Sequence, residues 1–110
     1  MRTTLTPLGL KTKLFRGFAD PSRLAILETL RRGAKNVSEI VDATGLSQPN
    51  ASMHLQCLWC CGLVDRATRG RFTYYRIRSP KTIRLLKAAG DLLQDVHDHI
   101  VECSRYGDGA

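Results

Sequence analysis

Residues 36–64, NVSEIVDATGLSQPNASMHLQCLWCCGLV, contain two short helical patterns separated by a tight turn. Asn36 followed three residues later by Glu39 has the spacing of a capping box, which starts the first helix. Ser47 is a suitable N-cap for the second helix, because serine side chains are favoured at this position. Pro49 is compatible with this start, since proline is tolerated in the first turn of a helix. Two short helices joined in this way predict a helix-turn-helix unit, in which the second helix enters the major groove of DNA.

Three more helices are predicted outside this unit. Thr6 and Asp20 each precede a proline, and a capping side chain before proline at the first helical position is a helix start. In the first of these helices, apolar residues recur at helical spacing up to Ala19. In the second, they recur to about Arg31. Ser79 precedes another proline and opens a last helix that is expected to run to about Ser104.

A β-hairpin is predicted between the helix-turn-helix unit and the last helix. Residues 63–64 and 72–77 are rich in β-branched and aromatic side chains and are expected to form two strands, with Arg69-Gly70-Arg71 at the tip. The order α-α-α-α-β-β-α, mainly helical with one hairpin, predicts a winged helix-turn-helix fold in which the hairpin is the wing. An unrelated small α+β domain with the same order is the alternative.

Length and charge narrow the class of protein. A chain of 110 residues is expected to form one domain over residues 1–110, with residues 79–104 as a C-terminal dimerisation helix. Seventeen Lys and Arg against ten Asp and Glu give a net charge of +7, which favours a polyanionic partner such as DNA. No apolar run approaches the roughly 20 residues of a membrane span, and a signal-peptide core is missing. A cytoplasmic protein without a membrane partner is therefore expected.

The second helix of the unit carries side chains that suit double-stranded DNA. Its start is polar and free of acids, and Gln48 and Asn50 are expected to pair with adenine edges. The predicted DNA-binding residues on this helix are Ser47, Gln48, Asn50, Ser52 and His54. Arginines on the wing are expected to reach phosphates and the minor groove. The predicted DNA-binding residues there are Arg69, Arg71 and Arg76.

The four cysteines indicate metal or redox chemistry. Cys57, Cys60 and Cys61 lie within five residues, and Cys103 lies in the last helix. Four residues apart on a helix, Cys57 and Cys61 face the same way, and they are expected to bind one soft metal ion together with Cys103. Cys60 is offset from Cys61 by about 100° around an ideal helix, so a ligand and a packed hydrophobe are equally expected there. Further candidate donors near Cys103 are His99 and Glu102.

Several effectors fit this thiol pattern. Thiolate-rich sites of low coordination number suit Cd(II), Pb(II), Cu(I) and trivalent arsenic, As(III), and Zn(II) becomes suitable if His99 takes part. The spacing leaves open whether Cys103 serves its own subunit or another. It also leaves open a thiol redox or persulfide switch, although a disulfide within an intact helix is strained. No Ser-His-Asp or paired-carboxylate arrangement is present, so neither an enzyme nor a small-molecule substrate is predicted.

Three ordered stretches resemble the ArsR/SmtB family of metal-sensing winged-helix repressors. They are residues 18–27 (FADPSRLAIL), residues 45–55 (GLSQPNASMHL) followed by residues 62–64 (GLV), and residues 70–76 (GRFTYYR). The resemblance implies a homodimer that forms through the first and last helices and binds operator DNA. An apolar face on the last helix agrees with this dimer and consists of Leu86, Leu93, Val96 and Ile100.

The cysteine pattern is similar to one branch of this family. A thiol pair that the family often carries would fall at residues 36–38 and is absent, and a histidine that would complete a site begun at residues 95–97 is also absent. Cys57, Cys61 and a cysteine near the C-terminus instead resemble the cadmium- and lead-sensing, CmtR-like branch, in which the last cysteine comes from the partner subunit. The resemblance therefore implies a repressor that metal releases from its operator.

Overall fold

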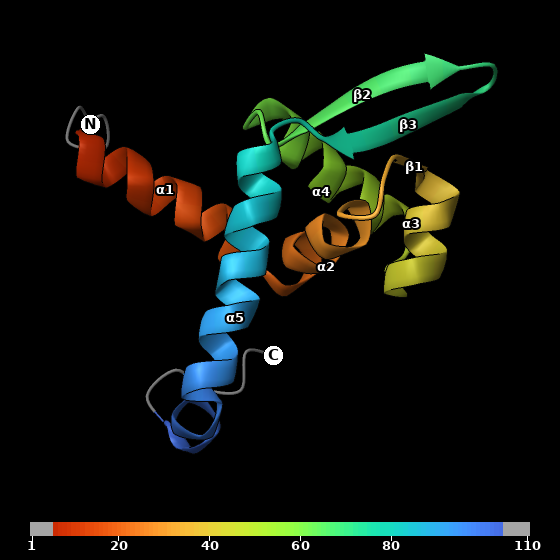
Figure 1. Cartoon of the computed structure of the whole chain (residues 1–110). Coiled ribbons are helices and arrows are strands. Elements are labelled where there is room, and N and C mark those ends of the chain that lie inside the picture. Colours follow the sequence, from red (N-terminus) through yellow and green to blue (C-terminus); the bar gives the residue numbers. More distant parts are fainter. Residues whose placement is uncertain (1–5, 105–110) are drawn as a thin grey trace.

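The computed structural model describes residues 6–104 as five helices and a three-stranded antiparallel sheet (Figure 1). The helices are α1 (Pro7–Ala19), α2 (Pro21–Leu30), α3 (Val37–Thr44), α4 (Gln48–Cys60) and α5 (Pro80–Glu102). The strands are β1 (Lys35–Asn36), β2 (Val64–Arg69) and β3 (Phe72–Ile77). The hairpin of β2 and β3 extends beyond α2, α3 and α4 as a wing, so the predicted winged helix-turn-helix fold is confirmed.

The predicted helix starts are confirmed by capping hydrogen bonds. The side chains of Thr6, Asp20 and Ser47 accept from the backbone N–H three residues later at 3.0, 3.0 and 3.2 Å. At α3 the capping box is complete, because the Asn36 and Glu39 side chains each accept from the other's backbone N–H at 2.9 Å. These bonds satisfy N–H groups that have no partner inside the helix. Short-range sequence therefore determines where the helices begin.

The cap at Asp20 offers a test by pH. The Arg23 backbone N–H that donates to its carboxylate holds the pKa of Asp20 below the ordinary value of 3.8, and the charges of Arg23 and His54 lower this pKa further. A carboxylate with a depressed folded-state pKa stabilises the fold above its unfolded-state pKa. This contribution is lost as the pH falls through the folded-state pKa.

We therefore expect Asp20→Ala to lower the free energy of unfolding by about 1 kcal/mol near neutral pH. The difference from the wild type should shrink as the pH is lowered below 3.8, which urea unfolding at a fixed protein concentration measures. Asp20→Asn keeps a capping oxygen and should retain most of the stability near neutral pH. A difference between Asp20→Ala and the wild type that stays constant into acid would contradict this account.

The sheet places β3 between the other two strands. β2 and β3 pair antiparallel, with Val64 opposite Ile77, and β1 pairs with the other edge of β3. The strand β1 is an addition to the predicted elements, because two residues show no alternation that a pattern can detect. The strand predicted to start at residue 63 is β2, which begins at Val64. The Leu63 N–H instead donates to the Leu58 carbonyl at 3.0 Å, a bond that belongs to the end of α4. The observed order is α-α-β-α-α-β-β-α.

The core fills the space between α2, α3, α4 and the sheet, and the first turns of α5 close it. Its buried residues are Ile26, Leu27, Leu30, Ile40, Leu55, Leu58, Leu63, Val64, Tyr75, Ile77 and Leu86. Leu86 was predicted to lie in a dimer surface, and this prediction is wrong because the side chain is only 3% exposed. The early part of α5 contacts β3, which turns Leu86 into the core of its own chain.

Two helices present apolar side chains that a single chain does not cover. The later turns of α5 extend away from the other helices, and α1 projects in another direction (Figure 1). On α5, Leu93 and Ile100 are 48% and 47% exposed and Val96 is half-buried, while Leu8 and Phe15 of α1 are also exposed. Over residues 6–104, none of the helices combines the length and the apolar character needed to cross a membrane.

Candidate DNA-binding surface and thiol cluster

The helix α4 is held by one face and exposes the other. Ala51, Leu55 and Leu58 are buried in the bundle and fix the rotation of α4 about its axis. The structure places four of the predicted DNA-binding residues on the surface at the start of this helix, namely Ser47, Gln48, Asn50 and Ser52. These donors and acceptors are therefore available to base edges and phosphates.

The structure corrects the prediction for His54. This residue was expected on the exposed side of α4, yet it is half-buried. Its charge contributes to the lowered pKa of Asp20, so the ring lies near the junction of α1 and α2. The reason is its position three residues after the buried Ala51 and four before the buried Leu58, which turns it toward the inner side of the helix. His54 consequently lies beside the surface that faces outward and not at its centre.

Two exposed residues of α4 were missed by the sequence reasoning. Met53 and Gln56 lie on the side of α4 opposite the buried residues, and Met53 is 58% exposed. A count of 100° per residue from the apolar positions of the helix would have found both.

The wing carries the predicted arginines in two different environments. The Arg69 guanidinium lies 5.5 Å from the centre of the Tyr74 ring, and Arg71 is exposed at the tip of the hairpin. Arg76 forms an ion pair of 3.3 Å with Asp65, which also pairs with Arg78 at 2.8 Å. The charge of Arg76 is thus partly compensated, although its side chain is 64% exposed. Arg69 and Arg71 at the tip present the freer positive charge.

Contacts of one further arginine join the wing to the end of α4. Arg66 lies over the Trp59 ring at 3.9 Å from its centre, which is a cation–π contact. Its guanidinium also donates to the Gln56 side-chain oxygen at 3.2 Å, and the Gln56 amide donates to the Cys60 sulfur at 3.6 Å. The last turns of α4 are therefore linked through side chains to strand β2.

The three clustered cysteines lie at the end of α4, beside α1. Cys57, Cys60 and Cys61 are exposed and line a groove of about 480 Å³ together with Leu10 and Leu14 of α1. Partial burial raises the pKa of the Cys61 thiol, and the neighbouring Cys57 thiol raises this pKa further. The structure thus brings together Cys57 and Cys61, the pair whose spacing indicates a shared face.

The fourth cysteine is not brought to this cluster. Cys103 is the half-buried C-cap of α5, and the helix α5 ends far from the end of α4 (Figure 1). His99 and Glu102 are exposed near the same end of α5. In the part of the chain that is described, no three His, Cys, Asp or Glu side chains form a group able to hold a metal ion. One chain therefore supplies a pair of thiols but does not complete a coordination sphere.

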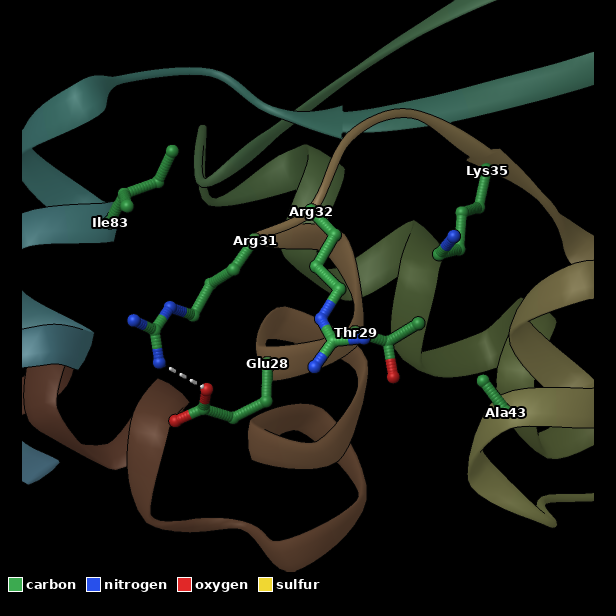
Figure 2. A pocket seen from close by; sticks show the side chains of 7 residues that line it. All are labelled: Glu28, Thr29, Arg31, Arg32, Lys35, Ala43 and Ile83. Atoms are coloured by element: carbon green, nitrogen blue, oxygen red, sulfur yellow. Dashed lines mark hydrogen bonds and ion pairs between the residues drawn. The ribbon is translucent and has the colours of Figure 1, made fainter.

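A hollow of about 690 Å³ lies elsewhere, between the end of α2, β1, α3 and the start of α5. Figure 2 shows its basic side chains, with Arg31 paired to Glu28 at 2.8 Å, while Arg32 comes from the connection after α2 and Lys35 from β1. Cations after the end of a helix offset the negative end of its dipole. This hollow therefore needs no ligand to account for its charge.

A helix-turn-helix with a polar outer helix face and an arginine-tipped wing defines a winged helix-turn-helix DNA-binding protein. Residues 20–66 match the family model described as bacterial regulatory protein, arsR family. The chain is 36% identical over 93 residues to the "Probable mercury resistance operon repressor" of Streptomyces lividans, which covers 84% of this chain and 74% of that protein. It is 37% identical over 84 residues to the HTH-type transcriptional regulator CmtR of Mycobacterium bovis, covering 76% and 69%.

The fold is also similar to a solved structure. The solution structure of a homodimeric winged helix-turn-helix DNA-binding domain from Mycobacterium bovis aligns with a TM-score of 0.70 at 34% identity, covering 82% of each chain. The present chain belongs to the ArsR family of bacterial regulatory proteins. It is accordingly a DNA-binding transcriptional regulator and not an enzyme.

Proposed function

We propose that this protein is a homodimeric repressor that a thiophilic metal ion, Cd(II) or Pb(II) in the first place, releases from operator DNA. The observation that carries the metal part is that the exposed thiols of Cys57 and Cys61 line one groove at the end of the DNA-reading helix. A metal ion held by this pair acts on the reading helix itself. The similarity to a protein named for mercury resistance supports a soft metal as the effector.

The DNA-binding part rests on α4 and the wing. In a two-fold dimer the two α4 helices enter successive major grooves of a palindromic operator. Gln48 and Asn50 present amides that suit adenine edges, and Ser47 and Ser52 present hydroxyls for bases or phosphates. Arg69 and Arg71 at the wing tip, with Arg76 behind them, supply the sequence-independent attraction to the backbone.

Dimerisation is supported by the uncovered apolar side chains of α1 and α5. The exposed ones are Leu8, Leu10, Leu14, Phe15, Leu92, Leu93, Ile100 and Val101. Their burial between two chains is favourable by about 25 cal/mol for each Å² removed from water. We assign Leu93, Val96 and Ile100 to this interface on α5, and Leu86 to the core.

The metal ligands proposed are Cys57 and Cys61 of one subunit with Cys103 of the partner subunit. Two thiols are half a site, and the far position of Cys103 in its own chain directs the third ligand to the partner. His99 and Glu102, near the same helix end, are further donor candidates. We place Cys60 outside the ligand set, because its sulfur accepts a hydrogen bond from Gln56.

The donor set selects the class of metal. Three thiolates suit large soft ions such as Cd(II) and Pb(II), and they also suit trivalent arsenic; Zn(II) would require His99 as an additional donor. The raised pKa of Cys61 means that its thiol carries a proton near neutral pH, which a metal ion has to displace. Metal affinity is therefore expected to rise with pH.

The proposed switch is mechanical. Joining the end of α4 to the partner subunit's Cys103 restrains the helix that has to fit the major groove. The contacts of Arg66 with Trp59 and Gln56 extend this restraint to the wing. A preference of a few kcal/mol of the metal for the non-binding arrangement is enough for a large loss of operator affinity.

The experiment is a titration of the reduced, metal-free protein with Cd(II) in the presence of a fluorescent duplex that the protein itself has selected from random DNA. Thiolate-to-metal absorption and fluorescence anisotropy are followed in the same samples. We expect absorption to saturate near one ion per subunit while the DNA is released. Absorption without release contradicts the switch. If hydrogen peroxide releases the DNA and metal does not, the result would favour a thiol redox switch. The three exposed thiols of Cys57, Cys60 and Cys61 are the observation that supports this alternative.

A further inference from the structure

One exposed apolar side chain lies on the DNA-reading helix. Of the large hydrophobic residues that are exposed within residues 6–104, eight lie on α1 and α5, where the proposed dimer accounts for them. The other three are Leu24, Met53 and Phe72, with exposures of 37%, 58% and 48%. Met53 is the most exposed of these three, and it lies in the second turn of α4.

The rotation of α4 directs Met53 straight outward. Ala51, Leu55 and Leu58 define the inner side of the helix. At 100° per residue, Met53 points about 170° away from the mean direction of these three side chains. Asn50 lies one turn before it, so the thioether lies next to one of the polar side chains assigned to base reading.

An apolar group at this place has one matching partner in the major groove. Base edges there present hydrogen-bond donors and acceptors, and the single apolar group among them is the 5-methyl of thymine. Methionine is flexible and polarisable, which lets it adapt to a small apolar partner. A side chain with 58% of its surface in water has apolar area left to bury.

We propose that Met53 is a specificity-determining residue that selects a thymine in each operator half-site by packing against the thymine 5-methyl group. The inference rests on the proposed insertion of α4 into the major groove. It is independent of the metal response, because the contact is made by the metal-free protein.

The test uses deoxyuridine, which pairs like thymine and lacks only the methyl group. A duplex selected from random DNA by the full-length, reduced, metal-free protein is prepared with each thymine of the half-site replaced in turn, symmetrically in both halves. Affinities are measured by fluorescence anisotropy for the wild type, Met53→Ala and Met53→Leu. At one thymine position, we expect deoxyuridine to lower the affinity of the wild type about fourfold per half-site, which is the contribution of one buried methyl group. For the symmetric duplex the loss of affinity is then about 15-fold.

The variants separate this contact from effects of deoxyuridine on the DNA. Met53→Ala should bind the thymine and deoxyuridine duplexes equally, whereas Met53→Leu should keep most of the discrimination. Ser52→Ala truncates the neighbouring residue. This variant should bind both duplexes more weakly, but the ratio of its affinities for the thymine and deoxyuridine duplexes should equal that of the wild type. Equal ratios for the wild type and Met53→Ala, or a wild type insensitive to deoxyuridine at every position, would overturn the proposal. Failure of Cd(II) to release the DNA would overturn the metal switch and leave this result intact.

Discussion

Cys57→Ser is expected to bind the operator as the wild type does and to stay bound at Cd(II) concentrations that release the wild type completely. The serine hydroxyl is nearly the same size, so the exposed end of α4 keeps its structure. The hydroxyl is a poor ligand for a soft ion, and of the proposed ligands only Cys61 then remains at this end of α4. Mutation of a residue that only supports a ligand lowers metal affinity by up to roughly 100-fold. Loss of a direct ligand such as Cys57 should lower the Cd(II) affinity by more than this. Thiolate-to-metal absorption measures the loss of Cd(II) binding, and the anisotropy of the fluorescent duplex shows whether the DNA stays bound.

Cys60→Ser is the matched control for this variant. It removes a thiol from the same helical turn with the same change in size, and its sulfur only accepts the Gln56 hydrogen bond, which a serine oxygen can also accept. We expect Cd(II) absorption and DNA release close to those of the wild type. Cys103→Ser should behave like Cys57→Ser. If Cys60→Ser loses the response and Cys103→Ser keeps it, the proposed ligand set is wrong.

Leu93→Glu is expected to separate the dimer and to weaken operator binding by at least about 100-fold. In a dimer, binding of the first α4 helix brings the second to its half-site at a high effective concentration, and a monomer loses this advantage. The substitution places a charge in the middle of the proposed apolar interface, where removing a charge from water is costly. Analytical ultracentrifugation should show a species near 12.3 kDa, and anisotropy should show the lost affinity.

The neighbouring Gln94→Glu adds the same charge one residue along the exposed side of α5. We expect it to remain dimeric and to bind DNA with an affinity near that of the wild type. Circular dichroism should show equal helix content for both variants, because neither position lies in the core. A Leu93→Glu protein that remains dimeric at micromolar concentration would refute the assignment of this face to the interface.

The helix starts were predictable because each depends on atoms three residues apart. Asn36 and Glu39 form the capping box that their spacing indicates, and Ser47 caps α4 in the same way. The helix-turn-helix unit follows from such local signals. The spacing of Cys57 and Cys61 is equally local, because positions four apart share a face on any helix.

Predictions about exposure were less successful, because exposure depends on which elements meet. Leu86 belongs to an apolar stripe on α5 that looks uniform in sequence, yet the packing of its first turns on β3 divides this stripe into a core part and an uncovered part. His54 follows the polar start of α4 and turns toward the junction of α1 and α2. The strand β1 exists only because β3 offers it an edge.

The sequence by itself determined the helix starts, the order of the five helices and the hairpin, and the pairing of the two thiols, because these depend on short-range hydrogen bonding and local periodicity. The basic character of the wing follows directly from its composition. The tertiary structure decided that Arg66 packs on Trp59, that Met53 faces outward, and that Cys103 lies away from Cys57 and Cys61 within one chain. These features join, expose or separate residues through the packing of whole helices against the sheet. Such packing minimises the exposed apolar surface of the entire chain, which no local stretch of sequence specifies.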